Sequence, residues 1–297
     1  MSKKPKVGMW SGLTAVTAVL TAGAIVGTTV AFHYTTTVNN YLDADTYKII
    51  KGDSDEDTEY FKSDFTSDEE RESYEAELCA QVEAEGAALL KNDNNALPLA
   101  SGAKVSLFGH GSVDLMYGGT GSGSVDTSKA PNFKQALEDQ GVQVNSTLWD
   151  LYSSDDMMKN YSRITPAAIS DTLEANTQYA VNEAPWSKLS SAESSFADYG
   201  DAAIVVFSRS GGEGADLPSG ENGTNDFWIK GQEGDGNYLA LSAEEKELLQ
   251  NLKTLKDNGT FKKIIVLINS SNAIEMDFLN PEICGEDYGI DSAMWIG

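Results

Sequence analysis

The sequence AAIVVFSRSGGEGADLP, residues 202–218, joins an apolar run to a glycine-rich turn. Its first six residues, 202–207, form a short apolar run rich in β-branched side chains, which is typical of a strand buried on both faces of a parallel sheet. Gly211, Gly212 and Gly214 follow, and they let the backbone turn sharply and leave open space. Glu213 lies in that space at the carboxyl end of the strand, where ligands bind in open α/β sheets. We interpret Glu213 as a candidate functional carboxylate, with an ordinary solvated loop glutamate as the alternative.

The rest of the chain alternates predicted strands and helices. Residues 104–109 and 261–269 are apolar runs that predict buried strands. Ser242-Ala243-Glu244-Glu245 is a capping box, and the helix it begins ends at Asn258-Gly259. Further signals predict helices from Ser67 towards Leu90, over 132–140 and over 190–199. Residues 147–161 are predicted as helix and loop. Strands are predicted at 142–144, at Ile283 and at 293–296. This alternation predicts an α/β fold, a three-layer αβα sandwich with a mainly parallel sheet and helices on both faces.

Composition narrows the classes of function. The 297 residues carry a net charge of −25, which excludes a nucleic-acid partner because phosphates require a basic surface. The chain has two histidines, His33 and His110, which are too few to favour a histidine-based metal site or a Ser-His-Asp triad. We therefore predict no metal and no cofactor. Cys79 and Cys284 are far apart in sequence and are compatible with a disulfide or with two buried free thiols.

The N-terminal residues predict a membrane anchor. Lysines in the tail 1–9 precede the apolar stretch 10–32, which is long enough for a hydrocarbon core that takes ~20 residues. The lysines should stay inside, so the protein is expected on the cell membrane as a single-pass protein with its globular domain extracellular. A cleaved signal peptide, cut near Ala22-Gly23-Ala24, is the alternative. The apolar stretch continues past that point, which favours the anchor.

Two segments after the anchor have different compositions. Residues 33–66 are polar, with an acidic cluster at 53–57, and predict a spacer that holds the domain 67–297 away from the membrane. The loop GGTGSGS, residues 118–124, follows the 104–109 strand and has the backbone to cradle a phosphate. It lacks the Gly-Lys-Ser/Thr ending of a P-loop and the dinucleotide spacing, so a flexible loop is favoured over a nucleotide site.

The segment from about Glu85 to Gly297 resembles the C-terminal-type α/β-sandwich domain of glycoside hydrolase family 3, the β-glucosidase-like enzymes. The motifs that carry this resemblance stand in the family's order: EGAALLKN (85–92), LPL (97–99), KVSLFG (104–109), GGTGSG (118–123), SRSGGEGADLP (208–218), the helix 239–255, IIVLIN (264–269) and DYGIDSAMW (287–295).

This resemblance implies a retaining mechanism on a β-linked oligosaccharide or glycoside. In the family, a TIM-barrel domain supplies an Asp nucleophile and the sandwich domain supplies a Glu acid/base, with the two carboxyl groups about 5–5.5 Å apart. The Gly-Glu-Gly pattern places the acid/base at Glu213, which should be protonated in the free enzyme at working pH. Ser122 matches a position that reaches the sugar in relatives and is the predicted substrate-binding residue.

The sequence departs from the family pattern in three ways. A membrane anchor stands where most relatives have the barrel, which is similar to a permuted arrangement with the barrel after the sandwich. The chain stops at 294–297, inside a motif that relatives continue, so we expect the domain to be C-terminally incomplete. No nucleophile is visible, because Ser63-Asp64-Phe65 lacks a preceding buried strand and reads as a chance match. Leu217 follows Asp216 where relatives often have Arg, so no role is assigned to Asp216.

Two functions follow as hypotheses. The first is the acid/base-bearing domain of a retaining β-glycosidase that acts outside the cell and is inactive without the TIM-barrel domain. The second is a non-enzymatic extracellular carbohydrate-binding module on a membrane anchor.

Overall fold

The computed structural model describes residues 7–42, 61–119, 121–123, 125–164, 179–213 and 237–297. The chain forms two compact units, Met1–Asp64 and Phe65–Gly297. The acidic cluster 53–57 and the loop residues 214–218 lie outside the described residues.

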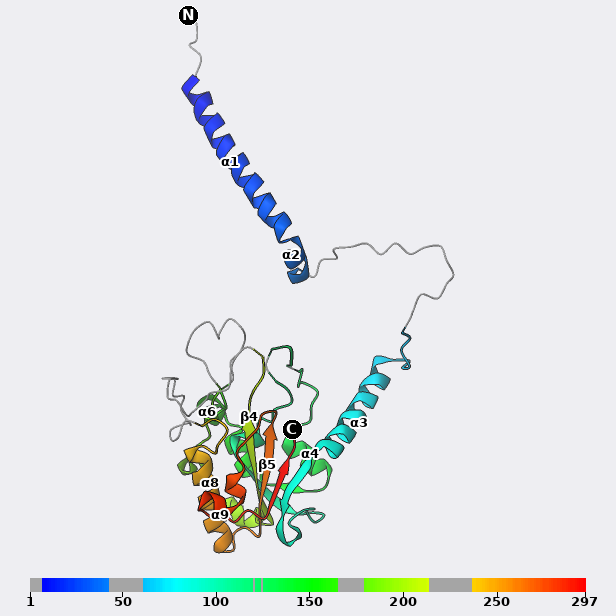
Figure 1. The fold of residues 1–297 in the computed structure, drawn as a ribbon, viewed down its shortest axis with the longest axis vertical. Coiled ribbons are helices and arrows are strands. Elements are labelled where there is room, and N and C mark those ends of the chain that lie inside the picture. Colours follow the sequence, from blue (N-terminus) through cyan, green and yellow to red (C-terminus); the bar gives the residue numbers. More distant parts are fainter. Residues whose placement is uncertain (1–6, 43–60, 120, 124, 165–178, 214–236) are drawn as a thin grey trace, which may run out of the picture. The chain divides into compact units, whose positions relative to one another are not determined.

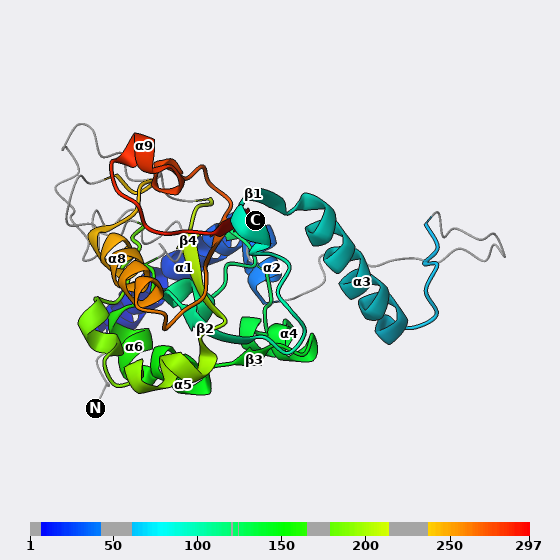
Figure 2. The same cartoon turned by 90° about the horizontal axis from the view of Figure 1, so that it is seen from below.

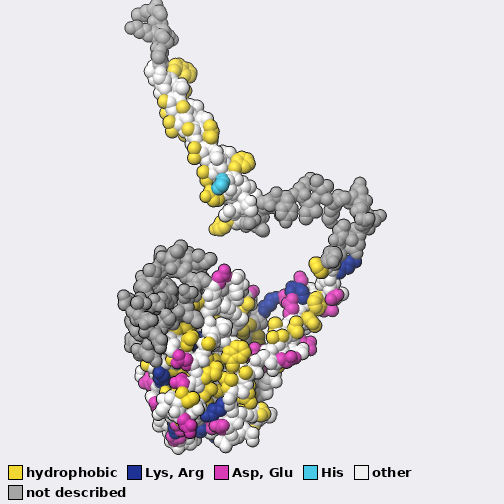
Figure 3. All heavy atoms as spheres, viewed as in Figure 1, with side chains coloured by type: hydrophobic (Ala, Val, Ile, Leu, Met, Phe, Trp, Pro, Cys, Tyr) yellow, Lys and Arg dark blue, Asp and Glu magenta, His cyan; other side chains and the backbone are white. Residues whose placement is uncertain are grey.

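The first unit contains α1 (Val7–His33) and α2 (Thr35–Tyr41). Hydrophobic side chains are distributed along α1 (Figure 3). Threonine hydroxyls of α1, such as those of Thr14 and Thr28, donate to the carbonyl four residues earlier, so these polar groups are satisfied within the helix. The segment Trp10–His33 is long and apolar enough to cross a membrane, a property that a signal sequence at the N-terminus shares.

The second unit is built on one sheet, which among the described residues has six strands in the order β1-β6-β5-β4-β2-β3 (Figure 1). All neighbouring strands are parallel except the pair β1 and β6, which is antiparallel. The strands are β1 (Ala88–Asn92), β2 (Lys104–Phe108), β3 (Gln143–Val144), β4 (Ala202–Arg209), β5 (Ile264–Ser270) and β6 (Ser292–Trp295). Every residue of β4 is buried, which confirms the predicted strand at the centre of the fold.

Helices cover both faces of the sheet, and Figure 2 shows α8 and α4 on opposite sides of the strands. The larger core cluster joins one face to α5 (Ser146–Tyr152), α6 (Asp155–Asn160), α8 (Ala243–Asp257) and the 3₁₀ helix η5 (Glu193–Tyr199). A smaller cluster joins the other face to α4 (Phe133–Asp139) and to Leu97 and Leu99. The predicted three-layer α/β sandwich is confirmed.

The helix α8 begins and ends where the sequence predicts. The Ser242 hydroxyl accepts from the Glu245 N–H at 3.2 Å, and the Glu245 carboxylate accepts from the Ser242 N–H at 2.8 Å. This reciprocal pair satisfies two N–H groups that the helix leaves without a partner. Leu248, Leu249 and Leu252 are buried against the sheet, so this helix fixes one layer of the sandwich.

Several local predictions were wrong, and tertiary contacts explain why. Ile283 lies exposed in the short helix α9 (Pro281–Cys284), because the Asn280 side chain caps its first turn and Pro281 stands at its first position. Residues 190–199 form 3₁₀ turns rather than an α-helix, since hydroxyls such as that of Ser195 bond to the backbone three residues back. Residues 88–92, to which no strand was assigned, pair with β6.

The helix α3 (Asp68–Gly86) begins at Ser67 as predicted, with the Ser67 hydroxyl accepting from the Glu70 N–H. It ends at Gly86 instead of near Leu90, because the next residues pair in β1. Neither alternative for the cysteines is correct: both are free thiols, Cys79 exposed and Cys284 only half-buried.

Candidate active site

Loops from β2, β4 and β5 meet at the carboxyl edge of the parallel strands (Figure 1). The loop after β2 carries the glycine motif 118–123, and the loop after β4 carries Glu213. Since β2, β4 and β5 are neighbours in the sheet, their carboxyl ends bring together segments that lie far apart in the sequence.

Ser122 and Glu213, the two predicted site residues, are in direct contact. The Ser122 N–H and hydroxyl both donate to Oε2 of Glu213, at 2.8 and 2.7 Å. Gly121 has φ +68°, and a Cβ there would lie 2.6 Å from both Cβ and Oε2 of Glu213. The glycine is therefore required twice, for its backbone conformation and for the space it leaves to the carboxylate.

The charge state of Glu213 differs from the expected one. Its side chain is exposed, and the hydrogen bonds from the Ser122 hydroxyl and N–H lower the pKa of the carboxyl below its ordinary value. A raised pKa needs burial of the carboxyl or a second negative charge close to it. In this conformation the lowered pKa favours the ionised carboxylate, opposite to the protonated form expected for the free enzyme.

Arg209, the last residue of β4, is fully buried and saturated with hydrogen bonds. Its guanidinium pairs with both carboxylate oxygens of Glu245, at 2.8 and 2.7 Å. It also donates to the carbonyls of Tyr238 and Ala240, both at 2.7 Å. Arg209 therefore ties the end of β4 to the backbone at Tyr238 and Ala240, just before α8.

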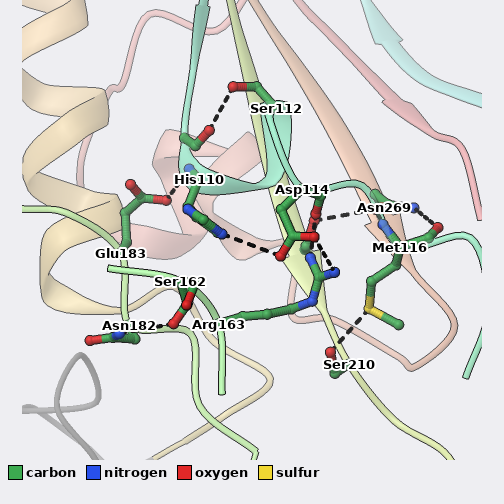
Figure 4. Close-up of polar contacts among 12 residues, drawn as sticks. His110, Ser112, Asp114, Met116, Ser162, Arg163, Asn182, Glu183, Ser210 and Asn269 are labelled. Atoms are coloured by element: carbon green, nitrogen blue, oxygen red, sulfur yellow. Dashed lines mark hydrogen bonds and ion pairs between the residues drawn. The ribbon is translucent and has the colours of Figure 1, made fainter. Parts of the chain in front are cut away.

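A second polar cluster, labelled in Figure 4, joins the first residues of the loop that follows β2 to Arg163. Asp114 lies 3.3 Å from Nε2 of His110 and 3.1 Å from Nη2 of Arg163. Burial raises the pKa of Asp114, but the contact with His110 and the charge of Arg163 outweigh it, so the pKa lies below its usual value. This cluster anchors the start of the segment that leads to Ser122.

A pocket of about 440 Å³ opens between this cluster and the glycine motif. Asp114, Tyr117, Gly119, Phe133 and Arg163 contribute to its lining. Among the residues described, no group of three or more His, Cys, Asp or Glu side chains is arranged to hold a metal ion.

Residues 87–285 match the glycosyl hydrolase family 3 C-terminal domain. The chain belongs to glycosyl hydrolase family 3. The resemblance inferred from the motifs is thereby confirmed, and the loops described above are those of a family 3 C-terminal domain.

Relatives of this family 3 domain include the β-glucosidase A of Butyrivibrio fibrisolvens, 31% identical over 216 residues that cover 67% of this chain and 23% of the relative. A β-glucosidase of Ruminococcus albus is 29% identical over 223 residues, covering 74% of this chain and 20% of the relative. The chain thus spans between a fifth and a quarter of the length of these curated relatives. The structure of β-glucosidase 3B from Thermotoga neapolitana in complex with glucose shares the fold, with a TM-score of 0.54 at 23% identity over 76% of this chain and 27% of that chain.

The structure also locates residues that the sequence analysis rejected or did not consider. Asp64 is exposed and lies outside any strand, in agreement with its interpretation as a chance match. Sequence reasoning missed Arg209 and Glu183, both buried. The available signal for Arg209 was a charged residue two positions after the apolar run 202–207, since a buried charge requires a partner.

Glu183 predicts a pH dependence of stability. Its carboxylate accepts from the N–H groups of His110 (2.7 Å) and Ala184 (2.9 Å), and burial raises its pKa to about 7, against the opposing effects of His110 and of these donors. Since the folded-state pKa lies above the ordinary value of 4.5, folding favours the protonated form. The stabilisation is complete below that ordinary value and is lost as the pH rises through about 7.

We expect thermal melts of the chain to show a loss of roughly 2–3 kcal/mol from this group between about pH 5 and pH 8. Glu183→Gln, which cannot ionise, should make the melting temperature less dependent on pH across this window. Exposed Glu193 gives the control, and Glu193→Gln should follow the wild type. An unchanged pH dependence in Glu183→Gln would show that this carboxyl does not titrate in the window.

Proposed function

We propose that this chain is the acid/base-bearing domain of a retaining β-glycosidase that hydrolyses β-linked glycosides, with Glu213 as the acid/base and Ser122 as a substrate-binding residue. The observation that carries the proposal is the contact between Glu213 and Ser122 at the carboxyl edge of a family 3 domain. The printed names of the relatives, β-glucosidases, support the substrate class.

The acid/base role requires that the pKa of Glu213 rise when substrate is bound. Two changes act in that direction. A sugar oxygen that accepts the hydrogen bond of the Ser122 hydroxyl draws this donor away from Glu213 and so removes the main cause of the lowered pKa. Closure of a second domain over the exposed carboxyl removes water, and desolvation disfavours the charged form. The proton then lies where it can be given to the glycosidic oxygen.

A retaining mechanism also needs a nucleophilic carboxylate on the opposite face of the sugar, about 5–5.5 Å from the acid/base. We propose that a TIM-barrel domain supplies this Asp. The 297-residue chain alone should therefore show no turnover of aryl β-glucosides above background. This chain together with the proposed barrel, which we call the full-length protein, should be active. Release of the aryl group by the chain alone at the full-length rate would contradict the proposal. Sugar binding by the chain alone, without activity in the full-length protein, would favour the carbohydrate-binding module.

We further propose that α1 anchors the protein in the cell membrane with the sandwich domain outside. About 20 apolar residues are needed to cross the hydrocarbon core, and Trp10–His33 meets this requirement. The protein should sediment with membranes, and protease added to intact cells should remove the domain. A soluble product that begins near Ala24 or later would identify α1 as a cleaved signal peptide instead.

A further inference from the structure

The side chain of Asn269, which follows the apolar part of β5, is hydrogen-bonded to the loop that carries Ser122. Asn269 is 4% exposed. Its Oδ1 accepts from the N–H of Met116 at 2.6 Å, and its Nδ2 donates to the carbonyl of the same residue at 3.0 Å (Figure 4). The carboxamide thus pairs with both backbone polar groups of Met116, as a neighbouring strand would, and fixes the position at which the glycine motif begins.

A second asparagine, three residues on, grips the loop that carries Glu213. The Asn272 Nδ2 donates to the carbonyl of Ser210 at 2.8 Å. The same amide lies against Gly211, where a Cβ would come within 2.3 Å of it. The Ser270 hydroxyl donates to the Asn272 carbonyl at 3.0 Å and holds the turn that presents this side chain.

The two gripped loops touch each other directly. A Cβ on Gly119 would lie 3.1 Å from the Gly211 carbonyl oxygen, and Gly121 leaves the same kind of space to Glu213. The Ser210 hydroxyl donates to the Met116 sulfur at 3.2 Å, which joins the bases of the two loops. With backbones this close, a small shift of either base separates Ser122 from the carboxylate.

We propose that Asn269 and Asn272, the asparagine pair, are positioning residues that hold the Ser122 loop and the Glu213 loop in register from the carboxyl end of β5. Neither side chain is placed at the substrate; each acts through the backbone of a loop base. The expected effect on catalysis rests on the proposed function, but the hydrogen bonds from the two asparagines to the loops belong to the domain alone.

The direct test uses Asn269→Asp and Asn272→Asp in the detergent-solubilised 297-residue chain. Aspartate keeps the size and one acceptor, but it loses the N–H donor and places charge against the Met116 or Ser210 carbonyl. Asn280→Asp is the matched control, because Asn280 uses its oxygen to cap α9 and aspartate caps as well as asparagine does. Hydrogen–deuterium exchange is then followed at the Ser122 amide, which donates to Glu213.

Both variants should speed exchange at Ser122 by about five- to tenfold, as expected for one lost hydrogen bond, while β4 and β5 stay as protected as in the wild type. Asn280→Asp should leave Ser122 unchanged. Unchanged exchange at Ser122 in folded variants would overturn the proposal, as would equal acceleration across β4 and β5. If Asn269→Asp does not fold, Asn272→Asp, which is only half-buried, decides the matter; failure of both to fold would assign the asparagines to the core and overturn the positioning role.

In the full-length protein, the variants should lower kcat more than they raise KM. Since Ser122 lowers the pKa of Glu213 in the free enzyme, a looser contact should move the alkaline limb of the kcat/KM profile to higher pH, as Ser122→Ala should. A merely destabilised enzyme would lose activity without this shift. If Glu213→Gln leaves turnover intact, the proposed function fails, yet the exchange at Ser122 still tests the grip.

Discussion

Glu213→Gln in the full-length protein should lower the turnover of β-glycosides with poor leaving groups by about 10²–10⁴-fold, the contribution of general acid–base catalysis. Glutamine keeps the size of the side chain and an oxygen for the two Ser122 donors, so the fold and substrate binding should be preserved. What is removed is the proton that the glycosidic oxygen needs as the bond breaks. Steady-state kinetics on unactivated glycosides give the measurement.

Activated aryl glycosides sharpen this experiment, because their leaving groups need little protonation. Their glycosylation step should be affected far less by Glu213→Gln. Ser122→Ala is the matched variant: it removes one donor to Glu213 and the proposed sugar contact but leaves the acid in place. It should therefore raise KM on both kinds of substrate without the selective loss on poor leaving groups. Near-native turnover of unactivated glycosides by Glu213→Gln would place the acid/base elsewhere.

Glu245→Gln should lower the free energy of unfolding by about 3–5 kcal/mol, because it leaves Arg209 as an uncompensated buried charge. The pair is fully buried, and both carboxylate oxygens are bonded to the guanidinium. This is a large fraction of the stability of an ordinary domain, for which about 5–15 kcal/mol is typical. Urea denaturation of the detergent-solubilised chain gives the measurement.

Exposed Glu193 supplies the control, since its substitution also removes one carboxylate charge from the domain. Glu193→Gln should change the free energy of unfolding by no more than about 0.5 kcal/mol. If Glu245→Gln proves equally mild, Arg209 is either solvated or held adequately by its carbonyl partners, and the importance of the ion pair for stability is overstated.

The elements that could be predicted from the sequence are those with strong local signals. A run of apolar, largely β-branched residues predicts the strand β4, and a capping box predicts the start of α8. The elements that could not be predicted depend on distant partners. Residues 88–92 form an edge strand only because β6 lies beside them, and Ile283 adopts a helical turn because Asn280 caps it.

The candidate site likewise has features that local sequence predicts and features that depend on distant contacts. Glu213 and Ser122 follow from family motifs, but 91 residues separate them, and only the neighbouring positions of β2 and β4 bring them together. The lowered pKa of Glu213 could not be predicted, because a pKa depends on burial, neighbouring charges and hydrogen bonds that no sequence spacing reveals. Asn269 resembles any polar residue at a strand end until its contacts with Met116 are known.

The product that a Glu213→Ala variant of the full-length protein forms with azide tests the central claim most directly. The truncated side chain leaves room for a small anion that needs no general base. In a retaining mechanism, azide attacks the covalent glycosyl-enzyme from the β face, forms the C–N bond and displaces the nucleophilic carboxylate. The account predicts that an activated aryl β-glycoside yields a β-glycosyl azide, identified by NMR, together with a faster turnover. An α-glycosyl azide, or free sugar released at the wild-type rate with no azide product, would contradict it.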